Sequence, residues 1–299
     1  MIDIAIVTER ACLSVNPEVK YSAMGVEENT ILKNTFTSQN INCEIVAWDD
    51  PEFDWSTTKL ALIRTTWNYF YLIPEFRNWV KNTAEKCKLI NSEDLVLWNM
   101  DKHYLFDLQE KGIRIPETYI LQADALFDPD FWMEKFGTKG FVVKPTISGG
   151  SKDTYFVKPP FDDQTISSIK KDVKRQQTMV QAFVPSIVKE GEVSIMFIDG
   201  NFTHAMIKRP KSNDFRVQPY HGGTHNKYIP NENEIAFGKR VLKACEEIKG
   251  SPLYARIDFC YSDTGKILLM ELEIIEPQLW LPETEKALTA LQQAIKNLL

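Results

Sequence analysis

Two neighbouring stretches near the C-terminal end decide how the chain is interpreted: YARIDFC, residues 254–260, and ILLMELEI, residues 267–274. Both carry apolar residues at alternate positions, which is typical of β-strands with one buried face. A two-residue turn at residues 264–265 predicts an antiparallel hairpin in which Asp258 lies opposite Glu271. In that register the apolar positions of both strands share the other face: Ala255, Ile257 and Phe259 with Leu268, Met270, Leu272 and Ile274.

The polar face of this hairpin collects three carboxylates, those of Asp258, Glu271 and Glu273, together with the guanidinium of Arg256. Like charges that lie opposite each other destabilise a sheet, so we expect a cation among them. Carboxylate oxygens are hard ligands, which makes Mg²⁺ the natural occupant and Mn²⁺ a second one. The alternative is a solvated face on which Arg256 pairs with one of the glutamates.

Composition excludes several classes of protein. The chain has 299 residues, of which 43 % are hydrophobic, and this is enough for a substantial core rather than a disordered chain. Its 35 Lys+Arg against 41 Asp+Glu give a formal charge of −6, which argues against a dedicated nucleic-acid binder. Five widely spaced cysteines without a CxxC pair indicate free thiols. The longest apolar run, residues 69–73, is too short for a bilayer, so we expect a cytoplasmic protein without membrane contact.

Strand and helix signals alternate over residues 1–95, which predicts an N-terminal domain with a parallel α/β sheet. The first strand continues into TERAC, residues 8–12, without a glycine, so neither a dinucleotide fingerprint nor a Walker A loop is present. The expected strands cover residues 2–7, 41–48 and 60–64, and the expected helices cover residues 21–38 and 74–86.

The remainder of the chain has an α+β pattern with largely antiparallel pairing. We expect two further domains, a central one over residues 96–184 and a C-terminal one over residues 185–299. The predicted elements are one helix over 93–110, strands at 140–145 and 179–184, a hairpin around Asp199-Gly200-Asn201, a helix over 234–249, and a last helix from residue 283.

Lys144 ends one of these strands, and a polar loop with the sequence Ser148-Gly149-Gly150-Ser151 follows it. Glycines let backbone N–H groups approach an anion closely, and a lysine beside them adds the positive charge that phosphate needs. A mobile turn without a ligand is the alternative reading of the same loop. Lys102, taken alone, is typical of a surface helix.

Taken in their order along the chain, these motifs resemble the ATP-grasp superfamily over about residues 95–280. The chain is most similar to the glutathione-synthetase-like ligases, near the branch that contains the cyclo-ligase of cycloserine biosynthesis. The superfamily motifs are Lys102, VKP at 143–145, SGGS at 148–151, QAFV at 181–184, GEVS at 191–194, RID at 256–258 and ELE at 271–273. The branch is indicated by WDD at 48–50, RTTWNY at 64–69, and DFRVQ at 214–218 before GG at 222–223.

The resemblance implies an ATP-grasp fold: an N-terminal parallel α/β (pre-ATP-grasp) domain, then two α+β subdomains that enclose ATP. It implies adenine contacts from Gln181, Ala182, Phe183 and Val184, ribose contacts from Glu192, and phosphate contacts from Lys102, Lys144, Ser148, Gly149, Gly150 and Ser151. It also implies Mg²⁺ ligands at Asp258, Glu271 and Glu273, with Arg256 facing the transferred phosphoryl group. Glu273 departs from the asparagine that is usual in the family, and a family-typical glutamate is missing at residues 181–182.

Such a site implies ATP-dependent ligation of a carboxylate to an amine or ureido nitrogen, through an acyl phosphate, on a small amino-acid-like substrate. Alternatives are a small-molecule kinase of the same fold and a non-catalytic ATP-binding module. A homodimer and a monomer are both open. Catalytic roles are expected for Arg256, Lys144 and Arg216, and substrate contacts for Arg64, Trp67, Lys208, Arg216, Gly222 and Gly223.

Overall fold

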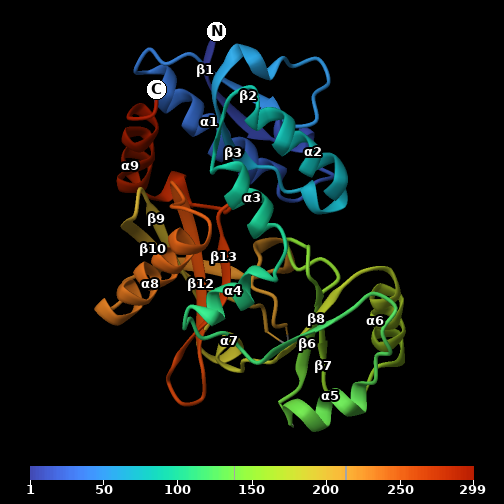
Figure 1. The fold of residues 1–299 in the computed structure, drawn as a ribbon. Helices are drawn as coiled ribbons and strands as arrows, with labels where there is room; N and C mark the ends of the chain where they lie inside the picture. The colour runs from blue at the N-terminus through green and yellow to red at the C-terminus, as the bar shows by residue number, and fades with distance from the viewer. Residues whose placement is uncertain (138, 213) are drawn as a thin grey trace.

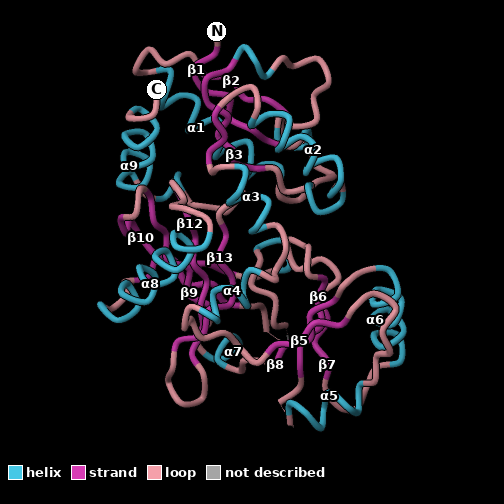
Figure 2. Tube along the Cα trace, in the orientation of Figure 1, coloured by secondary structure: helices cyan, strands magenta, loops and turns pink. Residues whose placement is uncertain are grey.

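The computed structural model describes residues 1–299 apart from 138 and 213, and the described strands form three sheets (Figures 1 and 2). The N-terminal sheet lies at the top of the view, with the C-terminal and central sheets below it. None of the helices in the described part of the chain combines the length and apolarity that a membrane span requires.

The N-terminal sheet is parallel throughout, with the strand order β2-β1-β3-β4. Helix α2 (Ile73–Ala84) buries Phe76, Trp79 and Val80, as the spacing of these residues predicts. The parallel pairing confirms the predicted α/β architecture. Its other elements are β1 (Ile2–Thr8), α1 (Ser22–Thr37), β2 (Cys43–Ala47), β3 (Thr58–Thr65) and β4 (Lys88–Ile90).

The central sheet is antiparallel, with the order β5-β8-β6-β7, and packs against two helices. Trp132 of one helix and Ile169 of the other are buried against Phe141 and Val143 of β6. The elements are β5 (Thr118–Leu121), α5 (Pro129–Phe136), β6 (Phe141–Pro145), β7 (Tyr155–Val157), α6 (Asp163–Arg175) and β8 (Thr178–Ala182).

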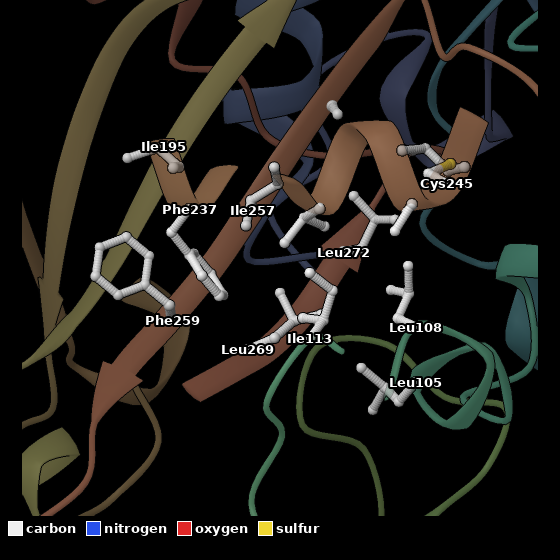
Figure 3. Packing of buried hydrophobic residues seen from close by; sticks show 14 of the residues in the cluster. Leu105, Leu108, Ile113, Ile195, Phe237, Cys245, Ile257, Phe259, Leu269 and Leu272 are labelled. Carbon is white, nitrogen blue, oxygen red and sulfur yellow. The ribbon is translucent and has the colours of Figure 1, made fainter. Parts of the chain in front are cut away.

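The C-terminal sheet has the order β11-β10-β9-β12-β13, and every neighbouring pair is antiparallel. Its core joins side chains of the sheet to those of two helices, α4 (Tyr104–Glu110) and α8 (Glu232–Ile248), as Figure 3 shows. The remaining elements are α3 (Glu93–Asn99), α7 (Ser186–Lys189), β9 (Glu192–Ile198), β10 (Asn201–Arg209), β11 (Thr224–Tyr228), β12 (Tyr254–Tyr261), β13 (Ile267–Glu273) and α9 (Glu285–Lys296).

The single helix expected over residues 93–110 is wrong, because the chain breaks between α3 and α4. At the break the side chain of Asp101 accepts the backbone N–H of His103 at 3.1 Å, a local turn that competes with helix. The backbone N–H of Lys102 then donates to Thr146 O at 2.9 Å. Lys102 is therefore buried beside the end of β6, not on a surface helix.

The β12–β13 hairpin places Asp258 opposite Glu271, as expected, but its turn differs from the prediction. The N–H of Ser262 donates to Lys266 O at 2.8 Å, which leaves a loop of three residues, 263–265, in place of two. Because of this extra loop residue, the strand residues next to the loop pair one position away from the predicted register.

A β-bulge at Met270 moves the register back. Phe259 pairs with Leu269, whereas Asp258 pairs with Glu271, so Met270 is an extra residue on its strand. The extra loop residue and the bulge shift the register in opposite directions and cancel at the carboxylates. The pairing of Asp258 with Glu271 was therefore predicted correctly although the predicted turn was wrong. The expected apolar face is wrong at this point, because fully buried Leu269 joins the core and Met270 lines a cleft.

The segment after β13, residues 274–279, is held by side chains along its whole length, and we call it the strap. Each of its six successive carbonyl oxygens faces a side-chain donor. These contacts are Asn91 Nδ2 to Ile274 O at 2.7 Å, Tyr254 Oη to Ile275 O at 2.9 Å, Trp67 Nε1 to Glu276 O at 2.9 Å, Arg64 Nη2 to Pro277 O at 2.7 Å, Arg256 Nη1 to Gln278 O at 3.4 Å, and His204 Nε2 to Leu279 O at 2.9 Å.

Arg64 joins the strap to the N-terminal sheet. Its guanidinium is fully buried, pairs with Glu28 of α1, and lies over the ring of Tyr254 with Cζ 4.9 Å from the centroid. A buried ion pair is costly to break, because the remaining charge has no water around it.

We expect Arg64→Leu to lower the free energy of unfolding by about 3–5 kcal/mol, because Glu28 stays buried without a counter-charge. Replacing both partners, Arg64→Leu with Glu28→Leu, should recover much of that loss. Urea denaturation of the two variants measures this. A loss below about 1 kcal/mol in the single variant, the range of an exposed pair, would contradict the assignment.

Candidate functional site

One cleft, walled by the central and C-terminal sheets and by residues of the N-terminal part, contains most of the residues that the sequence singled out. Arg64, Gly222 and Gly223 are not among its lining residues. The candidate residues that line it are Trp67, Lys102, Lys144, Ser148, Gly149, Gly150, Ser151, Gln181, Ala182, Phe183, Val184, Glu192, Lys208, Arg216, Arg256, Asp258, Glu271 and Glu273.

Asp258, Glu271 and Glu273 each offer a carboxylate oxygen, and these oxygens lie within 4.8 Å of one another. Strand alternation and the bulge at residue 270 together turn all three into the cleft. Three hard oxygen donors at this spacing fit a divalent cation such as Mg²⁺.

Two basic side chains balance the charge of this cluster. Arg256 donates to Asp258 through Nε at 3.0 Å and Nη2 at 2.9 Å, and it also pairs with Glu273. Lys208 Nζ lies 2.7 Å from Asp258 and 2.5 Å from Glu192. Burial alone would raise the pKa of Asp258, but Arg256 and Lys208 hold it well below the usual range. Burial raises the pKa of Glu273 to about 7, although Arg256 acts against this shift.

Two lysines beside the loop after β6 line the cleft. Lys102 Nζ donates to Ser148 O at 2.7 Å and lies 3.6 Å from Glu271. Lys144 forms no ion pair with any residue that the structure describes, and burial lowers its pKa. A half-buried ammonium without an ion-pair partner beside a glycine-rich loop is suited to an anionic ligand.

The loop at residues 148–151 is pressed between two aromatic rings. A Cβ added to Gly149 would collide with the ring of Phe70, and one added to Gly150 would collide with Tyr220 Oη. Gly150 also has a φ of +59°, which favours glycine. The loop therefore packs against the N-terminal part on one side and against the segment before β11 on the other.

The opposite end of the cleft is apolar. Phe183 lies against Phe156 with ring centroids 4.2 Å apart, and Met270 and Ile187 line the same cleft. Gln181 offers no charged group to a ligand. It is 2 % exposed, and its Nε2 donates to Thr118 Oγ1 at 2.8 Å. An apolar slot with backbone groups at its edge is suited to a flat heterocycle.

Trp280, which the sequence analysis missed, covers Arg256. Its backbone has a φ of +47°, which is rare for a bulky residue. The guanidinium carbon of Arg256 lies 5.6 Å from the centre of the indole ring. An aromatic face attracts a cation, so this contact holds Arg256 toward the carboxylates.

Other lining residues were also missed, because they come from loops that only the tertiary structure brings together. Glu276 and Gln278 alternate on the strap, but Glu276 lies three residues beyond Glu273, so extension of the strand pattern would have selected residues 275 and 277 instead. Of the others, Tyr69 and Phe215 lie in the motifs RTTWNY and DFRVQ, whereas nothing in the local sequence distinguishes Tyr21, Met24, Phe70 and Tyr220.

Two sequence-based interpretations need correction. Arg64 cannot contact a substrate, because it is fully buried against Glu28 and the strap. Gly222 and Gly223 shape a turn instead of lining the cleft; Gly222 has a φ of +87°. Lys208 lines the cleft, where it is 8 % exposed and paired with Asp258 and Glu192, and its contact with substrate stays a prediction.

Arg216 lines the cleft, but its guanidinium already has a hydrogen-bond partner in the protein. Its Nε and Nη2 donate to Asp214 at 3.1 and 2.9 Å, which holds the pKa of Asp214 below its usual range. A substrate carboxylate at Arg216 would have to share the guanidinium with this neighbour.

Two family models match the chain. The N-terminal domain of D-cycloserine synthetase DcsG matches residues 4–91, and the ATP-grasp domain of prokaryotic glutathione synthetase matches residues 112–252. A curated relative, the cycloserine biosynthesis protein DcsG of Streptomyces lavendulae, is 26% identical over 263 residues, which cover 85% of this chain and 88% of the relative.

Solved structures with the same fold span several kinds of ligase. The crystal structure of D-cycloserine synthetase DcsG has a TM-score of 0.83 at 23% identity and covers 99% of both chains. The D-alanine–D-alanine ligase of Bacillus anthracis complexed with ATP has a TM-score of 0.63 at 15% identity, covering 100% of this chain and 96% of that one. The macrocyclase MdnC of Microcystis aeruginosa MRC, bound with precursor peptide MdnA, has a TM-score of 0.65 at 11% identity and covers 99% and 100%.

Removal of one carboxylate should weaken cation binding without unfolding the protein. Glu271 is the best choice because its side chain is one-third exposed and its ion pair with Lys102 is long, at 3.6 Å. We expect Glu271→Gln to weaken Mn²⁺ binding at least about tenfold, as measured by calorimetry, with the thermal midpoint almost unchanged. Glu44→Gln, an exposed acid on β2, is the matched control. Equal Mn²⁺ affinity in both variants would contradict the site.

Proposed function

This chain belongs to the ATP-grasp superfamily, and from that membership we propose that it is an ATP-dependent ligase that joins the carboxylate of a small amino acid to a nitrogen nucleophile. The observation that carries the proposal is the single cleft in which three carboxylates, Arg256 and the ammonium of Lys144 converge beside a glycine-rich loop.

Different residues of the cleft are suited to different parts of ATP. Adenine fits the apolar slot at Phe183 and Met270, and the buried acid Glu192 is suited to ribose hydroxyls. Lys144 and Lys102 supply positive charge for the phosphates, and the loop at residues 148–151 covers them.

The three carboxylates would hold the divalent cation, for which we propose Mg²⁺. When bound, this cation neutralises charge on the phosphates and orients them. Arg256 lies among the same carboxylates, so its guanidinium is placed to stabilise the phosphoryl group in flight.

The reaction proceeds in two displacements. A substrate carboxylate oxygen attacks the γ-phosphorus, and the bond to ADP breaks. The nitrogen nucleophile then attacks the acyl carbon, loses a proton, and expels inorganic phosphate. The loop held between Phe70 and Tyr220 keeps water from the acyl phosphate, which would otherwise be hydrolysed.

The substrate class follows from the relatives. One relative is named D-cycloserine synthetase, and another structure of this fold is a D-alanine–D-alanine ligase. We therefore propose a small D-amino acid, with ring closure as the first candidate: β-aminooxy-D-alanine, the ring-opened form of D-cycloserine, or its ureido derivative. Arg216 is the proposed contact for the substrate carboxylate.

Purified protein with Mg²⁺ and ATP should release ADP and free phosphate in equal amounts when one of these amino acids or D-alanine is supplied. Lys144→Met should lower kcat by about a hundredfold or more, since a charge facing the phosphates is lost. Coupled ADP and phosphate assays, with mass spectrometry of the product, measure this. A stable phosphorylated product would indicate a kinase instead, and ATP binding without ADP release across the panel would contradict the ligase.

Loss of the Trp280 ring, which lies over Arg256, should slow the chemical step. We expect Trp280→Leu to lower kcat by about fivefold to thirtyfold, the range of a partly buried cation–π contact, with the KM for ATP almost unchanged. Trp280→Phe, which keeps an aromatic face, should recover most of kcat. A purely structural role would lower the fraction of active protein in both variants instead.

A further inference from the structure

Glu276 is a carboxylate in the cleft whose charge no described residue balances. It lines the cleft three residues beyond Glu273, and it forms no ion pair within the part of the chain that the structure describes. The neighbouring cations are already occupied: Arg256 by Asp258 and Glu273, and Lys102 by Glu271. Burial and the nearby charges of Glu273 and Glu271 raise the pKa of Glu276 well above its ordinary value, so the ionised form is stabilised when a ligand supplies a positive charge.

The position of Glu276 is fixed. Its own carbonyl accepts Trp67 Nε1 at 2.9 Å, and the next carbonyl, that of Pro277, accepts Arg64 Nη2 at 2.7 Å. With its main chain held on both sides, the residue cannot move to another cation. A positively charged group of a ligand in the cleft would supply the partner that the ionised form of Glu276 lacks.

Aromatic rings surround this part of the cleft. Trp67, which is bonded to the backbone of Glu276, lies edge-on to Tyr21 with ring centroids 5.6 Å apart. Tyr21 in turn lies 6.4 Å from Tyr220, and all three rings line the cleft. A carboxylate beside aromatic walls suits an organic cation, because ring faces attract positive charge.

Glu276 is not part of the metal cluster. The acids whose oxygens gather within 4.8 Å of one another are Asp258, Glu271 and Glu273, and Glu276 is not among them in the described residues. A hard metal ion is also a poor match for aromatic walls, whereas an ammonium group suits both the rings and the acid.

We propose that Glu276 binds the free ammonium group of the amino-acid substrate. This inference rests on the proposed function, since it assigns a substrate contact in the same cleft. It specifies the substrate further: the α-amino group is ionised and unblocked, so an N-acylated amino acid or a residue within a peptide is rejected. Aminooxy and ureido nitrogens are uncharged at neutral pH, which leaves the ammonium as the one cation that such a substrate presents.

A matched pair of probes tests the contact directly. D-Alanine and D-lactate share a carboxylate and a methyl group, and differ by ammonium against hydroxyl. We expect calorimetry with saturating Mg²⁺ and ADP to show that the wild-type protein binds D-alanine at least about tenfold more tightly, the range of a charge-assisted contact. Glu276→Gln should remove that preference while leaving D-lactate affinity within about twofold. Glu44→Gln, the exposed control, should keep the preference.

Three results would overturn the inference. The first is equal or absent binding of the two probes to the wild-type protein, and the second is a D-alanine preference that survives in Glu276→Gln. The third is loss of Mn²⁺ binding in Glu276→Gln, which would assign the acid to the metal. ADP release by the wild-type protein is scored separately. An active ligase without the D-alanine preference contradicts this inference alone, whereas a preference without ADP release contradicts the proposed function.

Discussion

The hydrogen bonds to the strap are the interactions on which the rest of the site depends. Six successive carbonyl groups, residues 274–279, face donors that come from β3, the loop after β3, the segment after β4, β10 and β12. A buried carbonyl left without a donor is costly, so each contact fixes the path of the backbone. This fixed path places Glu276, Gln278 and Trp280 in the cleft and attaches the N-terminal sheet to the carboxylate cluster.

The sequence was sufficient for features that depend on local periodicity and on the order of motifs. The parallel N-terminal sheet and the ATP-grasp fold are confirmed. The pairing of Asp258 with Glu271 is also as expected, because the longer turn and the bulge at Met270 shift the register in opposite directions and cancel. The turn and the bulge at Met270 could not be inferred, since each depends on how side chains pack beneath the hairpin.

The sequence could not identify which residue each buried charged side chain would contact in the folded protein. Arg64 lies at the carboxyl end of β3, as a ligand-binding residue of a parallel sheet would, yet Glu28 of α1 pairs with it and leaves it fully buried. Lys208 likewise depends on two acids from other strands, Glu192 and Asp258. Aromatic residues of the cleft come from separate loops, and no spacing rule relates Tyr21 to Tyr220.

The contacts of Gly149 and Gly150 have a kinetic consequence. Phe70 and Tyr220 belong to different parts of the molecule, and each meets one of the two glycines at close range. An outward movement of the loop would have to separate both contacts. In the proposed ligase, a smaller side chain in place of either ring would hold the loop from one side only, which would favour faster exchange of ligands over protection of the acyl phosphate.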